Sequence, residues 1–290
     1  MSNNDYLIVT SFNNNLYNIY AKKFIETFKS DFDLYVYSET DLTFTHNIKR
    51  LRKINIFNEM PNYKNFVKKH DNKPKDKFGA LKDTIFKNDT VRFSYKVFSL
   101  IHAIENYKNY KYIVWIDADF VFRDKSFNHK LFDLFVEDDK FMSYMGRDGV
   151  YSECGFLIFN TKNKYCLDYF RDIKELYLSE KIFKLTETHD SYIWDFMRKN
   201  YERKYNDFNN INITGYSYEL LKNKEEISKN FFISRECGSE VINRTFLFLF
   251  MCHKKGFKRK LSNFMIPANI MRVRSNNKLI YLKYDINIVL

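Results

Sequence analysis

Short apolar runs alternate with helix-like periodicity in the N-terminal third of the chain. Residues 6–10 and 34–37 are mostly apolar, the pattern of strands buried in a sheet. Between them, residues 20–28 carry aromatic and aliphatic side chains at helical spacing. This strand–helix–strand order predicts an α/β fold.

The pattern becomes sharper from residue 90 onwards. Apolar residues at 93, 97, 100 and 104 form one stripe of an amphipathic helix, with Arg92 and Lys96 together on the neighbouring face. Residues 111–116 are almost wholly apolar, which predicts a central strand. Further strands are predicted at 155–159, 211–213, 231–234 and 246–252, and further helices near 127–136, 163–178 and 190–203.

Residues 60–90 are rich in lysine and weakly patterned, with Pro74 and Gly79 near their middle. They predict a long, partly mobile loop over one or two short helices. A loop of that length is unusual in a compact domain unless it acts on a substrate.

Composition excludes several classes of protein. The 290 residues are 45% hydrophobic and 19% aromatic, which is enough for a sizeable core and excludes overall disorder. Only 7 Gly and 3 Pro argue against an all-β sandwich or propeller. The longest apolar run, 246–252, is too short to span a bilayer, and the polar first residues do not resemble a signal peptide. We therefore expect a soluble, cytoplasmic protein.

Charge adds a preference for anionic partners. Lys and Arg number 48 against 36 Asp and Glu, a net charge of +12. This favours phosphorylated small molecules, nucleic acid or peripheral contact with an anionic membrane, although an AT-rich genome produces the same composition. Because the basic residues are scattered without a nucleic-acid-binding signature, no nucleic acid is expected. The four cysteines include no C-x-x-C pair, so neither a zinc ribbon nor a disulfide framework is indicated.

The strongest candidate for chemistry is Asp117-Ala118-Asp119, directly after the predicted central strand. In an extended chain, residues two apart point to the same side, which would place both carboxylates at the carboxyl edge of the sheet. A divalent cation with hard oxygen ligands, Mn²⁺ or Mg²⁺, would relieve their repulsion and would also hold a diphosphate. The alternative is a solvated turn with two ordinary acids.

The same segment also fits a haloacid-dehalogenase-like phosphatase, in which Asp117 attacks phosphate and Asp119 is the general acid and base. That nucleophile normally follows the first strand of its domain. Here, about 110 residues with strand–helix–strand character come first.

Several segments together resemble the GT-A glycosyltransferases, most closely their glycogenin-like and lipopolysaccharide galactosyltransferase-like branch. Residues 110–122 are similar to that branch's strand and D-x-D motif, and Tyr95-Lys96 to its basic helix. Residues 151–160 resemble a Tyr-x-Asn-x-Gly strand, with Glu153 in place of Asn. Residues 189–195 are similar to its Asp-Gln-Asp element, with Asp190 on the first Asp and Ser191 in place of Gln. Residues 253–259 resemble its His-x-x-Gly-x-x-Lys signature, with Arg259 in place of Lys.

The resemblance implies a mixed central sheet flanked by helices, with a catalytic domain over residues 1–260. Its sugar-nucleotide-binding half would be 1–120, its acceptor half 121–260, and 261–290 a C-terminal extension packed on it. It further implies transfer of a sugar from a nucleoside diphosphate sugar, most simply UDP-linked, to a hydroxyl of a glycan, glycolipid or protein, with retention favoured.

The implied site residues fall into three groups. The metal ligands would be Asp117, Asp119 and His253, and the acids at the acceptor would be Glu153 and Asp190, either of which could instead be a structural hydrogen-bond acceptor. The sugar nucleotide would be bound by Asp117, which the resemblance gives both roles, and by Thr10, Ser11, Phe12, Arg92, Lys96, Gly256, Lys258 and Arg259. Surface or core roles are the alternatives for Phe12, His253 and the basic residues.

Overall fold

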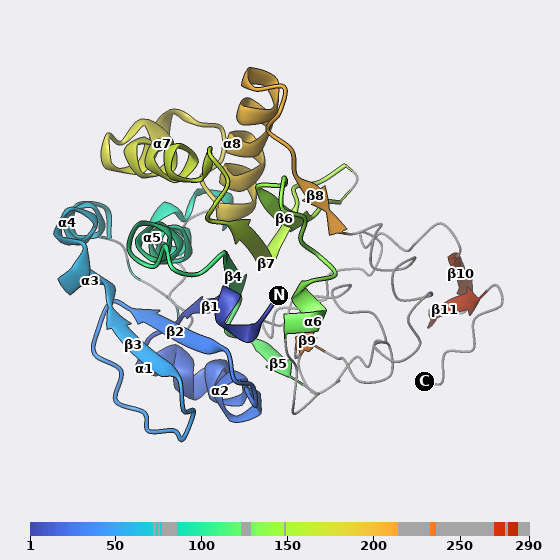
Figure 1. Cartoon of the computed structure of the whole chain (residues 1–290), viewed down its shortest axis with the longest axis horizontal. Coiled ribbons are helices and arrows are strands. Elements are labelled where there is room, and N and C mark those ends of the chain that lie inside the picture. Colours follow the sequence, from blue (N-terminus) through green and yellow to red (C-terminus); the bar gives the residue numbers. More distant parts are fainter. Residues whose placement is uncertain are drawn as a thin grey trace.

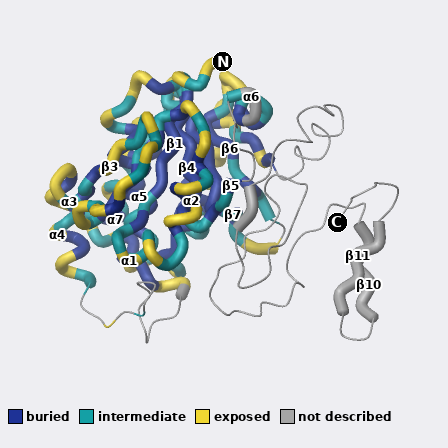
Figure 2. Tube along the Cα trace, turned by 90° about the horizontal axis from the view of Figure 1, so that it is seen from below, coloured by how far each residue is buried: buried dark blue, intermediate teal, exposed yellow. Residues whose placement is uncertain are grey.

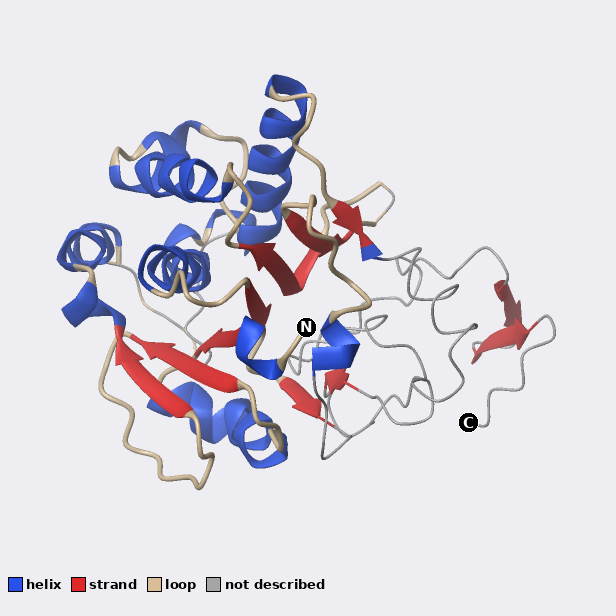
Figure 3. Ribbon diagram, in the orientation of Figure 1, coloured by secondary structure: helices blue, strands red, loops and turns tan. Residues whose placement is uncertain are grey.

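The computed structural model has a seven-stranded sheet at its centre, with strand order β3-β2-β1-β4-β7-β6-β8 (Figure 1, Figure 3). It describes residues 1–71, 74, 76, 86–122, 129–147, 149–213, 233–235, 270–275 and 278–283. The sheet strands are β1 Tyr6–Ser11, β2 Asp33–Ser38, β3 Leu51–Asn55, β4 Tyr112–Ile116, β6 Met142–Met145, β7 Glu153–Asn160 and β8 Ile211–Asn212.

The sheet is mixed. β1 pairs in parallel with β2 and β4, and β2 pairs in parallel with β3. β7 lies antiparallel between β4 and β6, and β8 is parallel to β6. The carboxyl ends of β1, β2 and β4 therefore meet the amino end of β7 at one edge of the sheet, where open α/β folds bind ligands.

Helices cover both faces of the sheet, which confirms the expected α/β fold. Their bounds are α1 Asn14–Leu16, α2 Lys22–Thr27, α3 Ile56–Glu59, α4 Pro61–His70, α5 Thr90–Asn106, α6 His129–Phe132, α7 Cys166–Leu178 and α8 Asp190–Lys204. Shorter helical turns are Asn3–Asp5, Tyr17–Ala21, Phe86–Asn88 and Lys181–Lys184. Helices α3, α4, α5, α7 and α8 contribute to the hydrophobic cluster on one face, while α2 and α6 contribute to the cluster on the other (Figure 1).

Successive side chains of a central strand point to opposite faces of the sheet, and both faces are buried, which explains why these strands are apolar throughout. In β4, Ile113 and Trp115 belong to the cluster beneath α5, whereas Val114 and Ile116 belong to the opposite cluster. Every residue of this strand is buried because helices lie on both sides (Figure 2).

Residues 60–90 contain α4 and the helical turn Phe86–Asn88, as expected for one or two short helices, and the loop predicted between them lies mostly outside the described residues. Helix α4 is ten residues long and buries Tyr63, Phe66 and Val67, which share one helical face despite the surrounding lysines. The structure also contains β3, α3 and β6, which the hydrophobic pattern did not predict. The predicted helix near 127–136 is described only as the four-residue α6.

The C-terminal part is described only in short pieces. Strand β5 Phe120–Phe122 pairs with β9 Ile233–Arg235, and β10 Ile270–Ser275 forms an antiparallel pair with β11 Lys278–Lys283. The predicted strand at 246–252 lies outside the described residues. The domain limits at 120 and 260 stay predictions.

Candidate functional site

Asp117 lies at the carboxyl end of β4, as predicted. Its backbone N–H donates to the Gly155 carbonyl at 2.8 Å, which continues the β4–β7 ladder by one residue. The Phe120 N–H then donates to the Asp117 carbonyl at 3.2 Å, so Ala118 and Asp119 lie in a turn leading into β5. The extended-chain argument for bringing the two carboxylates together therefore does not apply, and their convergence on one cation stays a prediction.

Lys96 connects the central strand with helix α8. Its Nζ lies 2.9 Å from Asp117 Oδ1 and 2.6 Å from Asp190 Oδ2, and it donates to the Cys154 carbonyl at 3.0 Å. The Lys96 ammonium also lies over the Trp115 ring, with Nζ 5.4 Å from the ring centroid. The indole Nε1 of Trp115 also donates to Asp117 Oδ1, at 2.6 Å. One carboxylate oxygen thus accepts from two rigidly placed donors.

The opposite charges in this cluster offset the effect of burial on the pKa values of Lys96 and Asp190. Burial alone lowers the pKa of Lys96, but Asp117 and Asp190 outweigh it, and the pKa of Lys96 lies well above its ordinary value. Burial raises the pKa of Asp190, and the Lys96 ammonium outweighs this effect, so the pKa of Asp190 lies below its ordinary value. Lys96 and Asp190 are therefore both held in ionised form.

Asp190 occupies the first position of α8, next to Ser191. The His189 side chain caps this helix by accepting from the Tyr192 N–H at 3.4 Å. The hydroxyl of Ser191 lies 3.0 Å from Cys154 Sγ, and burial raises the pKa of that thiol well above its usual value. The first turn of α8 is thus attached to the start of β7 directly beside Lys96.

Glu153 lies at the first position of β7, and both of its carboxylate oxygens have partners. Oε1 accepts from the backbone N–H groups of Cys154 at 3.1 Å and Gly155 at 3.2 Å. Oε2 accepts from Arg147 Nη1 at 3.2 Å, and the same guanidinium donates to the Tyr151 carbonyl at 2.7 Å. In this structure Glu153 acts as a hydrogen-bond acceptor that shapes the edge of the sheet.

The other predicted nucleotide-binding residues lie at different depths. Thr10 is wholly buried, and Phe12 is packed under Tyr17 and Phe44, with ring centroids 6.0 and 5.7 Å away. Ser11 is half-buried at the end of β1. Arg92 lies one turn before Lys96 on α5, half-buried with its guanidinium 5.5 Å from the Phe93 ring. The role of these residues at a nucleotide stays a prediction.

The predicted third metal ligand, His253, lies outside the described residues, as do Gly256, Lys258 and Arg259. Within the described part of the chain, no group of three or more His, Cys, Asp or Glu side chains is arranged to hold a metal ion.

Three residues at this site were not among the candidates. Trp115 orients Asp117, Arg147 holds Glu153, and Cys154 lies against Lys96. Trp115 and Cys154 lie in apolar segments, so their sequence context indicated only that they belong to the core. Arg147 precedes β7 without a motif, so only the folded structure reveals it.

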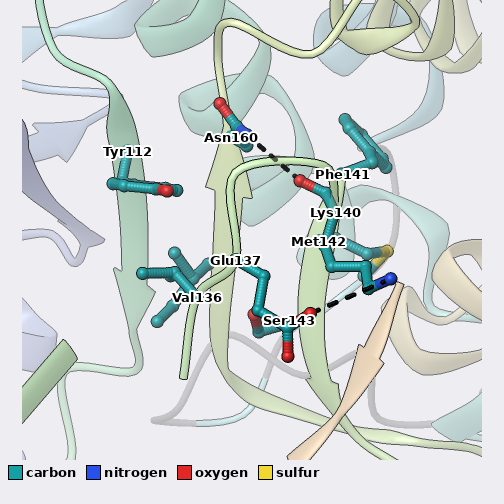
Figure 4. Close-up of a pocket in the computed structure, with 9 residues that line it drawn as sticks. Tyr112, Val136, Glu137, Lys140, Phe141, Met142, Ser143 and Asn160 are labelled. Carbon is teal, nitrogen blue, oxygen red and sulfur yellow. Dashed lines mark hydrogen bonds and ion pairs between the residues drawn. The ribbon is translucent and has the colours of Figure 1, made fainter. Parts of the chain in front are cut away.

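A small hollow lies at the other end of the same strands, lined by Tyr112, Val136, Met142 and Asn160 among others (Figure 4). Tyr112 and Asn160 are register partners at the start of β4 and the end of β7, remote from Asp117. The surrounding side chains leave no space in this hollow for a ligand. Asn160 donates to the Lys140 carbonyl here at 3.1 Å, so it supports the chain before β6.

No helix in the described residues is long and apolar enough to cross a membrane. No family model matches the chain, and no curated protein sequence matches it.

Solved structures to which the chain is similar include glycosyltransferases. One is a glycosyltransferase involved in glycosylation of the major capsid of PBCV-1, at 12% identity and a TM-score of 0.41, covering 81% of this chain and 94% of that one. Another is mouse xyloside xylosyltransferase 1, at 10% identity and a TM-score of 0.41, with 71% of this chain and 84% of that one covered. A third is the galactosyltransferase LgtC, at 13% identity and a TM-score of 0.41, covering 80% and 87%.

Proposed function

We propose that this chain is a metal-dependent glycosyltransferase that moves a sugar from a nucleoside diphosphate sugar, UDP-linked, to an acceptor hydroxyl. The observation that carries the proposal is the contact of Lys96 with Asp117 and Asp190 at the carboxyl edge of the sheet. Three segments far apart in the sequence supply these groups, and each belongs to a motif of the GT-A resemblance.

The chemistry of transfer accounts for such a cluster. When the bond to the anomeric carbon breaks, negative charge grows on the leaving diphosphate, and a positive site stabilises it. Asp117 and Asp119 offer the oxygen donors that Mn²⁺ and Mg²⁺ prefer, and these two residues would hold a divalent cation together with His253. The bound cation would supply charge stabilisation to the diphosphate.

The protein's own residues would keep this centre in place. Trp115 and Lys96 fix Asp117 Oδ1 from two directions, and Asp190 holds Lys96 from the side of α8. Burial of these groups strengthens their interaction because little water screens it. The arrangement would therefore be rigid before the donor arrives, which is what electrostatic stabilisation requires.

The hydrogen bonds of the two candidate acids support retention of configuration. An inverting enzyme needs a carboxylate to take the proton of the acceptor hydroxyl. Glu153 accepts from Arg147 and two backbone N–H groups, and Asp190 is ion-paired with Lys96, so both acids are engaged. A retaining mechanism does not strictly require such a base.

The test is a thermal-shift screen of UDP-, GDP-, CMP- and dTDP-sugars with and without Mn²⁺, followed by an assay of UDP release. We expect UDP-sugars to stabilise the protein in the presence of Mn²⁺. Asp119→Asn should reduce UDP release by about 100-fold or more. The matched control is Asp139→Asn, because the Asp139 side chain is 65% exposed and adjoins Asp138, which contacts Tyr112 at the end of β4 remote from Asp117; it should behave as the unmodified protein.

Two outcomes would contradict the proposal. One is the absence of binding to every nucleotide sugar, and the other is undiminished UDP release by Asp119→Asn. Capture of beryllium fluoride at Asp117 would instead favour a phosphatase.

A further inference from the structure

Three aromatic rings form a continuous row on the outside of α8. Tyr151 meets Tyr192 edge to face, with centroids 5.4 Å apart at 88°, and Tyr192 lies nearly parallel to Phe196 at 5.8 Å and 14°. All three residues are half-buried and keep part of their surface exposed to solvent. We refer to Tyr151, Tyr192 and Phe196 as the aromatic row.

The helix itself aligns two of these rings. Tyr192 and Phe196 are four residues apart, which places them on the same face of α8. The buried face of α8 includes Ile193, Trp194 and Met197. The row therefore lies at the margin of the core, where Tyr192 and Phe196 pack against the cluster without being enclosed by it.

The row begins at the candidate site. Tyr151 precedes Glu153 by two residues, and Arg147 holds both the Tyr151 carbonyl and the Glu153 carboxylate. The Tyr151 ring also packs edge-on against His189, with centroids 5.1 Å apart, and His189 directly precedes Asp190. A molecule lying on Tyr151 would thus be adjacent to the first turn of α8, whose Asp190 contacts Lys96.

Polar groups line the near end of the row. Lys87 Nζ lies 5.9 Å from the centroid of the Tyr151 ring and 2.5 Å from Glu187 Oε1. Glu187 Oε2 lies 2.7 Å from His189 Nε2. An ammonium and a carboxylate beside an aromatic face are able to donate to and accept from hydroxyl groups.

We infer that the aromatic row is the subsite for the acceptor, and that the acceptor is a pyranose sugar. This inference rests on the proposed function. One face of a pyranose presents C–H groups, whose weakly positive hydrogens are attracted to the negative face of an aromatic ring. Its hydroxyl groups would reach Lys87 and Glu187 at the rim of Tyr151.

The extent of the surface favours a sugar over a lipid or a protein segment. Among the described residues, the exposed large hydrophobic side chains are Met1, Val150, Leu167 and Phe183, and only Val150 adjoins the row in sequence. A protein interface or membrane contact would be expected to present a broader apolar patch. Three partly exposed rings with a charged rim fit a ligand of one or two sugar rings.

The test is saturation-transfer NMR of the full chain with methyl β-D-galactopyranoside and methyl β-D-glucopyranoside, with the dissociation constant taken from titration. The unmodified protein should transfer saturation to the ring C–H protons of at least one glycoside. Replacing both Tyr192 and Phe196 by Ala should weaken that binding by about tenfold or more. Tyr192→Phe keeps the ring and should retain the binding. If the double variant fails to fold by circular dichroism, Tyr192→Leu takes its place.

The control is Tyr205→Ala, which removes another partly buried ring just after the end of α8, tilted at 33° to the Tyr165 ring with centroids 4.6 Å apart. It should bind the glycosides as the unmodified protein does. UDP release by the unmodified protein, measured in parallel, separates the two proposals. Release without saturation transfer, or equal binding by the double variant, overturns the acceptor subsite alone, whereas absence of nucleotide-sugar binding overturns the proposed function.

Discussion

Lys96 is the residue whose surroundings are most constrained. Its ammonium is enclosed with Asp117 and Asp190 at 2.9 and 2.6 Å. Removing one member of a buried ion pair leaves charge uncompensated in a poorly solvated environment. The contact is therefore both a structural requirement of the fold and the centre of the proposed site.

We predict that Lys96→Met lowers the free energy of unfolding by about 3–5 kcal/mol, because the buried Asp190 and the half-buried Asp117 lose their counter-charge. Urea unfolding of Lys96→Met, Asp190→Asn and the double variant measures the loss of stability in each. The double variant should lose less than the sum of the single losses, since Asp190→Asn removes one of the orphaned charges. Lys22→Met is the control, because Lys22 pairs with Glu26 at 3.8 Å on an exposed surface; strictly additive losses would refute the coupling.

The surroundings of His102 predict how the stability of the protein depends on pH. The Nδ1 atom of His102 lies 2.9 Å from the Tyr37 hydroxyl, and burial raises the pKa of Tyr37, so the phenol stays protonated. Burial also lowers the pKa of His102, assisted by Arg52 and opposed by Glu59 and Glu105. Below its unfolded pKa of about 6.5, the unfolded chain thus binds a proton more readily than the folded one, and stability falls as pH falls.

The measurement is the urea midpoint at pH 7.5 and 5.5. The unmodified protein should be less stable at pH 5.5, and His102→Gln should show a smaller difference between the two pH values. An identical difference in both proteins would mean that other groups carry the pH dependence.

At the scale of elements, the packing of α4 on α5 shows where the hydrophobic pattern was insufficient. Tyr63 stacks on Phe98, with centroids 3.9 Å apart at 11°, and its hydroxyl lies 2.9 Å from Ser94 Oγ. The apolar face of α4, formed by Tyr63, Phe66 and Val67, was hard to recognise in the sequence because lysines occupy positions next to these residues. Strand β3 was missed for a related reason, because Arg52 and Lys53 are exposed at the edge of the sheet.

We predict that Tyr63→Ala destabilises the protein by about 3–5 kcal/mol, the usual cost of removing a large buried ring. Tyr63→Phe should cost only about 1 kcal/mol, because it removes a single hydrogen bond and keeps the stacking. Guanidinium unfolding compares the two. Similar stability of Tyr63→Ala and the unmodified protein would mean that α4 does not pack on α5 in solution.

At the scale of the whole molecule, each central strand contributes to the cores on both faces of the sheet. The only two tryptophans, Trp115 and Trp194, belong to the same cluster, on the face covered by α5 and α8. Tryptophan fluorescence therefore monitors one face, whereas far-UV circular dichroism monitors the helices of both.

We predict that the two signals follow one unfolding transition with the same midpoint, since neither face can lose its packing while the shared strands stay ordered. Chemical unfolding monitored by both signals is the test. Separate midpoints would indicate that the two faces unfold independently.

The sequence predicted the central architecture better than the site. β1, β2, β4 and β7 were recognisable because burial on both faces makes a strand apolar throughout. Lys96, Asp117 and Asp190 were each candidates, but their mutual contact joins residues far apart in the chain, which periodicity does not report. The structure also showed that Glu153, proposed as a catalytic acid, is held by Arg147, and that Asp119 lies in a turn.

The β4–β7 ladder makes the length of β4 as important as the identity of its final acid. Because successive side chains alternate between the faces of the sheet, one residue inserted within Tyr112–Ile116 would turn Asp117 toward α2 and away from Lys96. An insertion of two residues would restore the orientation of the carboxylate but displace it by roughly 7 Å along the strand. Natural variation in this segment should therefore consist of exchanges between apolar side chains, with gaps and duplications confined to the loops.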